Sequence, residues 1–273
     1  MVDLSIVVVG TNEKDFIYNC LNSIAHSNTR YKVETICIDN GSTDGTMELC
    51  SELFKEVTFI SNPHPTGYIE CNNRGIRMAK GRYIMLLNAD IELNPDTIEG
   101  MVSFMDNHPD GAAGTCRLNF DDGSLQLNCR RFPTPMTYLA RLPHFFRWLK
   151  FGKKWASNRI VSDYLMLDYD HKQPIVVDWV VSALFLLRKS AVDDIGLLDE
   201  DLVPPFYLED VDWCFRAYLR KWKIYYIPTV SAMHYYKRGS VKKFTKLSLV
   251  HILNVLIFFR KHGLKMLLNK NRK

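Results

Sequence analysis

The sequence predicts an α/β fold with a mostly parallel central sheet flanked by helices, and three observations lead to this prediction. Apolar runs of strand length alternate with segments of helical periodicity through the first half of the chain, joined by short polar connections. One run, residues 83–87, has no polar break, as in a strand covered on both faces. It ends at Asn88 and Asp90, and ligands of open α/β sheets collect beyond the carboxyl ends of strands.

The individual elements follow from the same periodicity. Runs rich in β-branched and aliphatic residues predict strands, and the connections between the first of them show the apolar spacing of helices. Residues 72–76 are expected to lead the short helix before the residue 83 strand, and residues 121–123 to form a turn. The expected strands are residues 4–9, 33–38, 57–60, 83–87, 112–118, 184–187 and 222–228.

The composition is that of a globular protein. Of the 273 residues, 47% are hydrophobic, and the net charge of +5 is mild. The seven cysteines are scattered without a C-x-x-C pair, which predicts reduced thiols in a cytosolic protein without zinc or disulfides. The N-terminus carries the acidic Asp3 and lacks the basic segment of a signal peptide, so it gives no indication of export.

Polar side chains at the strand ends predict a nucleotide site. The first turn, residues 10–14, is not G-x-G-x-x-G, and the sequence has no P-loop. Acids and amides suit a nucleobase N–H and ribose hydroxyls, while Arg74 is a candidate for contact with a diphosphate. Helix capping or turn formation is the alternative for each residue alone. The predicted donor-binding residues are Thr11, Glu13, Asp39, Asn40, Asp44, Asn73, Arg74, Asn88 and Asp90.

Asp90 is also a candidate metal ligand. Carboxylate and amide oxygens suit Mg²⁺ or Mn²⁺, which proteins typically bind through one or two carboxylates while substrate phosphates supply other ligands. The alternative is a strand followed by a turn, in which Asp90 and residues 94–96 cap the next helix.

Four segments together resemble the family 2 glycosyltransferases of the GT-A fold, whose central sheet is Rossmann-like. The segments are Val7–Asn12, Ile38–Thr46, Asn73–Ile76 and Leu86–Asp90, and the similarity extends to about Asp210. The resemblance implies that Asp39 recognises the base of a nucleotide sugar, that Thr11 and Glu13 line the same pocket, and that Asp90 holds a metal ion. Asn88 stands where many members have the first Asp of a D-x-D motif, as is usual in the rhamnosyltransferase-like branch.

A pair of acids, Glu209 and Asp210, begins a predicted amphipathic helix in the second half. Acids in a first helical turn are favoured by the helix dipole alone, but sugar transfer also needs a carboxylate to take the acceptor proton. The resemblance assigns the catalytic base to Asp210, with Glu209 orienting the acceptor or the base.

Two further sites follow from the resemblance. Asp178 and Trp179 precede a small-residue stretch that lines the acceptor site, in which Ser182 replaces the usual Gly, so both are predicted to bind the acceptor. His234 matches a position that donates a nitrogen to the metal in many members. A structural histidine is the alternative.

The expected organisation is a GT-A catalytic domain over residues 1–236, divided into a nucleotide-sugar-binding half, 1–118, and an acceptor half, 119–236. Residues 237–273 contain basic residues but no acid. Their apolar stretch is too short to span a bilayer, so we expect a basic amphipathic helix in the membrane interface. Docking on the catalytic domain or a second subunit is the alternative. The aromatic and basic stretch 138–155 suits a membrane interface or a packed insertion.

The sequence therefore predicts an inverting glycosyltransferase at the cytoplasmic face of the cell membrane. By resemblance the donor is dTDP-L-rhamnose, with a UDP-sugar as the alternative, and the acceptor is a polyprenyl-diphosphate-linked glycan of a surface polysaccharide such as O-antigen. A divalent Mg²⁺ or Mn²⁺ would be the cofactor, and a homodimer remains open. No nucleic-acid-binding module is recognised. A sugar nucleotidyltransferase is a second possibility, but it would need a basic, glycine-rich phosphate loop near the N-terminus, and residues 10–13 are a poor match for one. A non-catalytic membrane-associated scaffold is the remaining alternative.

Overall fold

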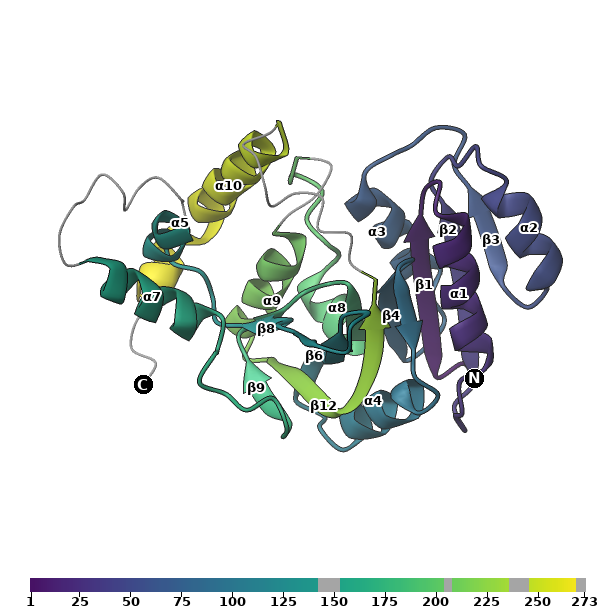
Figure 1. The fold of residues 1–273 in the computed structure, drawn as a ribbon, viewed down its shortest axis with the longest axis horizontal. Helices are drawn as coiled ribbons and strands as arrows, with labels where there is room; N and C mark the ends of the chain where they lie inside the picture. Colours follow the sequence, from purple (N-terminus) through teal and green to yellow (C-terminus); the bar gives the residue numbers. More distant parts are fainter. Residues whose placement is uncertain (142–152, 204–207, 236–245, 269–273) are drawn as a thin grey trace.

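A computed structural model describes residues 1–141, 153–203, 208–235 and 246–268 (Figure 1). Strand and helix alternate as the sequence predicts. The first seven elements are β1 (Leu4–Gly10), α1 (Lys14–Ala25), β2 (Val33–Asp39), α2 (Thr46–Leu53), β3 (Thr58–Ser61), α3 (Tyr68–Met78) and β4 (Tyr83–Asn88). They are followed by β5 (Ile91–Leu93), α4 (Thr97–Asp106), β6 (Gly111–Asn119), β7 (Leu125–Gln126), β8 (Cys129–Arg130), α5 (Pro135–Arg141), α7 (Lys153–Tyr164), β9 (Ile175–Val177), β10 (Trp179–Val180), β11 (Leu184–Arg188), α8 (Lys189–Ile195), α9 (Glu209–Leu219), β12 (Lys223–His234) and α10 (Lys246–Leu268).

The central sheet confirms the predicted α/β architecture. Its strand order is β3-β2-β1-β4-β11-β6-β12-β5, with β7 paired to β6 and β9 to β12. Strands β1 to β4 are parallel, whereas β11 runs antiparallel to both β4 and β6. The short strands β8 and β10 form a separate antiparallel pair. An apolar run buried on both faces does not reveal strand direction, so the sequence did not predict that of β11.

The chain changes direction around β1, which has β2 on one side and β4 on the other. In the register of these strands, Gly10 is opposite Asp39, Val9 is opposite Asn88, and Asp39 is opposite Ser61. The carboxyl ends of four strands therefore meet at one edge, at the switch point where such sheets bind ligands.

Helices cover both faces of the sheet. The buried side chains of α1, α2 and α4 share one apolar cluster, and those of α3, α8 and α9 share the other. Helix α3 lies very close to β1, since a Cβ at Gly75 would stand 2.2 Å from Cγ1 of Val7. The glycine thus sets the position of the helix that carries several predicted donor residues. The seven cysteines are free and buried.

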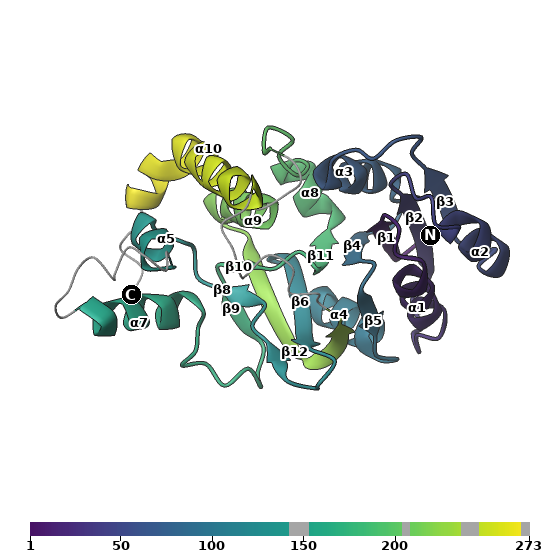
Figure 2. The same ribbon diagram turned by 45° about the horizontal axis from the view of Figure 1, so that its top comes forward.

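Helix α10 packs on the rest of the fold, and Figures 1 and 2 show it beside α9 at the end opposite α2. Asn254 and Phe258 are fully buried, and the Asn254 amide exchanges hydrogen bonds of 2.8 and 3.0 Å with the backbone of Val203. His262 bonds Asp212 of α9 at 2.7 Å. The face of α10 that carries Asn254, Phe258 and His262 thus docks on the rest of the protein, which the sequence analysis gave as the alternative to membrane binding.

The outer face of α10 keeps its apolar side chains exposed. Ile252, Leu253 and Leu256 are 41%, 46% and 62% accessible. None of the described helices combines the length and apolar character needed to span a bilayer. The aromatic and basic stretch at 138–155 falls mostly outside the described residues. Residues 237–245 and 269–273 of the basic C-terminal segment also fall outside them.

Candidate active site

The structure brings the two predicted metal ligands together. Asp90 follows β4, and His234 ends β12, which pairs antiparallel with β5 so that His234 is opposite Ile91. The His234 Nε2 and Asp90 Oδ1 atoms are 3.3 Å apart. Tyr235 fixes the turn by donating its backbone N–H to the Asp90 carbonyl at 2.9 Å. Sequence-distant residues thus form one polar pair at the sheet edge.

The geometry of this pair fits a divalent cation. The Nδ1 atom of His234 is 2.6 Å from Oε1 of Gln126, and a hydrogen bond there directs Nε2 at the Asp90 carboxylate. Two neighbouring ligands of an octahedral Mg²⁺ or Mn²⁺ would stand about 3.0 Å apart. In the described ranges no three His, Cys, Asp or Glu side chains converge. An ion held by Asp90 and His234 would take its other ligands from donor phosphates and water.

A second polar centre lies at the start of α9. Glu209 and Asp210 are only 5% and 8% exposed. The Asp210 carboxylate accepts backbone N–H groups from Val211 at 2.8 Å and from Ser182 at 3.2 Å, and the Ser182 hydroxyl donates to Glu209 at 3.1 Å. Leu208, the residue before the helix, has the left-handed φ of 82°, a strained value for leucine. Ser182, which replaces a glycine expected by resemblance, therefore orients both acids.

The environment of Asp210 suits a general base. Burial and then the negative charge of Glu209 raise the pKa of Asp210 to about 8, while the Arg130 charge acts in the opposite direction. A base works best when its pKa lies near the operating pH. Adjacent buried carboxylates with displaced titration are typical of functional sites.

Tyr68 connects the two polar centres, although the sequence analysis did not select it. Its hydroxyl donates to Oδ1 of Asn88 at 2.7 Å. Burial and then the charge of Glu209 raise the pKa of Tyr68, as expected for a hydroxyl close to the two buried acids. The expected start of α3 at residue 72 is wrong: the helix begins at Tyr68, where the Asn72 amide bonds the Tyr68 carbonyl at 2.9 Å.

The acids after β2 hold the loops of the predicted nucleotide pocket. Asp39 is 1% exposed and accepts hydrogen bonds from the Ser42 N–H at 3.2 Å and the Ser61 hydroxyl at 3.0 Å. The Asn40 amide oxygen accepts the Thr66 N–H at 2.8 Å. These bonds shape the loops after β2 and β3, and base recognition by Asp39 stays a prediction.

The first strand end joins the same group of loops. The Thr11 hydroxyl donates to the Asn40 carbonyl at 3.3 Å. Glu13 stands at the N-cap position of α1. Asp44 accepts the Thr46 hydroxyl at 2.5 Å and the Thr46 N–H at 3.1 Å at the start of α2, and the hydroxyl bond is the main cause of its lowered pKa. The predicted donor residues of β1 and β2 are thus assembled in one place.

Helix α3 uses its two predicted donor residues to hold neighbouring segments. Asn73 is fully buried, and its amide bonds both the N–H and the carbonyl of Leu198, at 3.0 and 2.9 Å. Arg74 donates to Oδ1 of Asn62 at 2.7 Å. The positions of the loop after β3 and of the loop after α8 therefore depend on these side chains.

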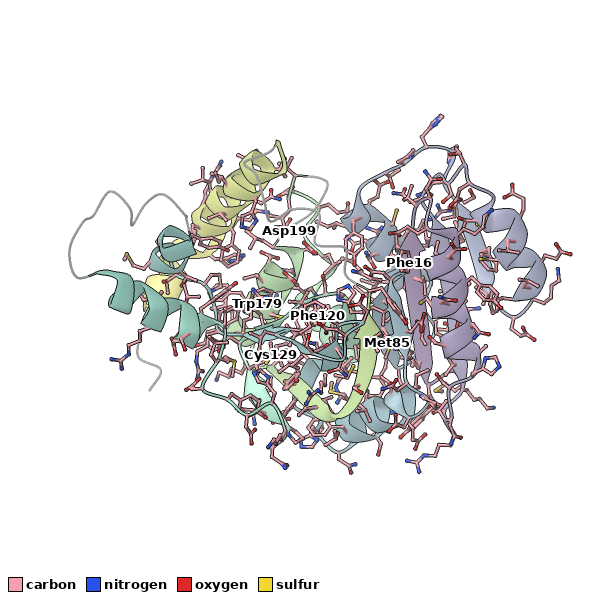
Figure 3. The ribbon with its side chains drawn as sticks, in the orientation of Figure 1. Phe16, Met85, Phe120, Cys129, Trp179 and Asp199 are labelled. Atoms are coloured by element: carbon pink, nitrogen blue, oxygen red, sulfur yellow. The ribbon has the colours of Figure 1, made fainter. Side chains whose placement is uncertain are left out.

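Asp178 and Trp179 tie β10 to the segment that contains β8. The Asp178 carboxylate accepts the Phe132 N–H at 2.8 Å, and the Trp179 indole N–H donates to the Arg131 carbonyl at 2.8 Å. Figure 3 shows Trp179 beside Cys129 on these paired strands. Acceptor binding by Asp178 and Trp179 stays a prediction.

A Rossmann-like sheet edge with a carboxylate–imidazole pair and two buried acids fits the transfer of a sugar from a nucleotide donor. The family model for glycosyl transferase family 2 matches residues 5–196. The chain belongs to this family and is a glycosyltransferase.

Relatives of known function are distant. The chain is 24% identical over 218 residues to the N-acetylglucosaminyl-diphospho-decaprenol L-rhamnosyltransferase of Mycobacterium tuberculosis, covering 76% of this chain and 68% of the relative. It is 22% identical over 274 residues to the rhamnosyltransferase WbbL of Escherichia coli K12, and this match covers 97% of this chain and 95% of WbbL.

The fold also resembles that of a solved glycosyltransferase. The structure of GalNAc-T7 with UDP, GalNAc and Mn²⁺ superposes with a TM-score of 0.69 at 16% sequence identity. The superposition covers 95% of this chain but 48% of that one, so the chain spans about half of the solved protein. This similarity supports the GT-A fold.

Proposed function

We propose that the protein is an inverting glycosyltransferase that moves L-rhamnose from dTDP-L-rhamnose to a polyprenyl-diphosphate-linked glycan in the synthesis of a surface polysaccharide. The observation that supports the proposal is that the Asp90–His234 pair and the buried Glu209–Asp210 pair lie at one sheet edge: the Asn88 N–H donates to the Ala183 carbonyl at 2.9 Å, and the preceding residue, Ser182, bonds both acids. The names of the two rhamnosyltransferases support the donor, and that of the mycobacterial relative supports the acceptor.

In the proposed reaction, the acceptor hydroxyl attacks the anomeric carbon from the face opposite the leaving group. A new bond forms between the acceptor oxygen and the anomeric carbon as the bond from that carbon to the diphosphate oxygen breaks. The proton of the acceptor hydroxyl passes to the Asp210 carboxylate. Glu209, held by the Ser182 hydroxyl, orients the acceptor or the base. Asp90 and His234 would hold the divalent ion, which when bound stabilises the charge developing on the departing nucleoside diphosphate.

The donor is tested by saturation-transfer NMR with dTDP-rhamnose, UDP-glucose, UDP-galactose, UDP-N-acetylglucosamine and GDP-mannose, each with and without Mn²⁺. We expect selective binding of the dTDP-sugar that strengthens with metal. Selective binding of a UDP-sugar would keep the mechanism and replace the sugar. Absence of binding to every donor by a folded sample would contradict the function.

The tail contributes a membrane contact to the same proposal. Residues 237–273 contain eight Lys and three Arg and no acid, and α10 exposes Ile252, Leu253 and Leu256. Apolar side chains beside basic ones bind an anionic bilayer surface. We therefore assign residues 1–236 to the catalytic domain and residues 237–273 to a tail whose helix α10 docks on this domain by one face and on the cytoplasmic membrane surface by the other.

Replacing Leu256 with aspartate is expected to weaken binding to vesicles that contain anionic lipid, because it places a negative charge on the apolar face. Leu53→Asp on α2 is the matched control, since Leu53 is 53% exposed at the opposite end of the molecule. Cosedimentation measures the bound fraction. An equal loss of vesicle binding in both variants would contradict the membrane contact. So would a dimer that forms as the protein concentration rises and is lost in Leu256→Asp.

A further inference from the structure

Arg130 occupies an unusual position beside the catalytic acids. It lies on β8 opposite Trp179 of β10. Its guanidinium carbon is 5.3 Å from the centroid of the Trp179 ring and 5.6 Å from that of Tyr164. Both rings are nearly fully buried. Two aromatic faces therefore fix the guanidinium in place, a contact that favours arginine over lysine.

The hydrogen-bonding capacity of Arg130 is largely unused. One Nη2–H donates to the Leu127 carbonyl at 3.2 Å, and the buried Nε–H finds no acceptor among the described residues. Within the same ranges no carboxylate pairs with it, whereas the neighbouring Arg131 pairs with Asp163 at 3.5 Å. A buried donor without an acceptor is costly. The Nη1 group also has no acceptor among the described residues and is not among their buried unsatisfied atoms, so the guanidinium keeps donors that a ligand can reach.

A continuous set of backbone contacts fixes Arg130 relative to the base. The N–H of Val181 donates to the Asn128 carbonyl at 2.8 Å, which joins the two segments that carry Arg130 and Trp179. The next residue, Ser182, donates its N–H to Asp210. The Arg130 charge is close enough to lower the pKa of Asp210. The guanidinium and the base thus belong to one rigid unit.

We propose that Arg130 binds a phosphate of the acceptor, so that the enzyme acts on the sugar attached directly to the lipid diphosphate. This inference rests on the proposed function and narrows its acceptor from any lipid-linked glycan to a monosaccharide-diphospho-lipid. A guanidinium is suited to phosphate because its parallel N–H groups match two phosphate oxygens. In such an acceptor only one sugar ring separates the attacking hydroxyl from the phosphate. Arg130 and Asp210 would then hold the two ends of the same ring.

The test compares two synthetic acceptors that share the sugar and differ in the linkage: an alkyl diphosphate ester and a neutral alkyl glycoside. We expect wild type to prefer the diphosphate in kcat/KM, chiefly through KM. Arg130→Gln should lose about 10- to 100-fold with the diphosphate, the usual effect of a charge-assisted bond, and change little with the glycoside. Arg131→Gln is the matched control and should preserve the preference.

Two outcomes would overturn the inference. Equal losses on both acceptors, with the pH profile moved to higher pH, would show that Arg130 acts only through Asp210. An unchanged preference would show that the phosphate lies elsewhere. Arg130→Lys keeps the positive charge but lacks the two parallel N–H groups, so its preference for the diphosphate acceptor should lie between those of wild type and Arg130→Gln. If Arg130→Gln does not fold, the lysine variant alone tests the inference. Failure of wild type to use either acceptor while still binding donor would instead contradict the proposed function.

Discussion

Replacing Asp210 with asparagine is expected to lower kcat by about 10²–10⁴-fold, the usual contribution of a general base, while donor binding is retained. The amide cannot take the acceptor proton, yet it is similar in size and its oxygen can still accept one of the N–H groups of Val211 and Ser182. Turnover by release of nucleoside diphosphate and donor binding by NMR measure the two properties. Asp193→Asn, at an exposed ion pair on α8, is the control.

The pH profile gives an independent check on Asp210. The pKa of the Asp210 carboxyl is raised to about 8, so this group keeps its proton, and cannot act as a base, until the pH approaches that value. We therefore expect kcat/KM to rise with pH and to level off above about pH 8. At pH 6 the rate should be about a hundredfold below the plateau. Near-normal turnover by Asp210→Asn, or a wild-type profile that is flat from pH 6 to 9, would remove Asp210 from the role of base.

Asp90→Asn is expected to abolish the metal dependence of donor binding and to slow transfer by at least about a hundredfold. A metal contributes several kcal/mol to the stabilisation of a leaving group, and each 1.36 kcal/mol is a factor of ten. The amide is a weaker ligand than a carboxylate and carries no charge. Titration of Mn²⁺ into the donor complex, followed by paramagnetic relaxation, measures metal affinity directly.

The control for Asp90 is Asp96→Asn. Asp96 is an exposed aspartate six residues further along the chain, at the start of α4. His234→Ala should weaken metal binding as Asp90→Asn does, because the two side chains are 3.3 Å apart. Retention of Mn²⁺ affinity by both site variants, or its loss in Asp96→Asn, would refute the metal site.

The strand ends could be predicted from the sequence because a buried parallel strand is a continuous apolar run that stops at a polar residue. Asp39, Asn88 and Asp90 were found in this way, and the register places their strand ends side by side. Asp210 and His234 depended on family resemblance, since an acidic first turn and a lone histidine each have a structural explanation. The structure then showed Asp210 next to Ser182 and His234 next to Asp90.

Features that depend on tertiary pairing could not be predicted. Strands β8 and β10 have two residues each, too few for a periodic pattern, so nothing indicated that Arg130 would lie over Trp179. Nothing in the sequence selected Tyr68, and only its hydrogen bond to Asn88 shows that it belongs to the site. The docking of α10 depends on Asn254, which interrupts the apolar segment, and on His262, which follows the basic residues after that segment.

The stereochemistry of the transfer product tests the central claim most directly. The enzyme would be incubated with dTDP-rhamnose, Mn²⁺ and the alkyl-diphospho-sugar acceptor, and the anomeric configuration of the new linkage determined by NMR. A single displacement assisted by Asp210 predicts a configuration opposite to that of the donor, with one nucleoside diphosphate released for each sugar transferred. Retention of the donor configuration, or transfer of the sugar together with a phosphate, would contradict the account.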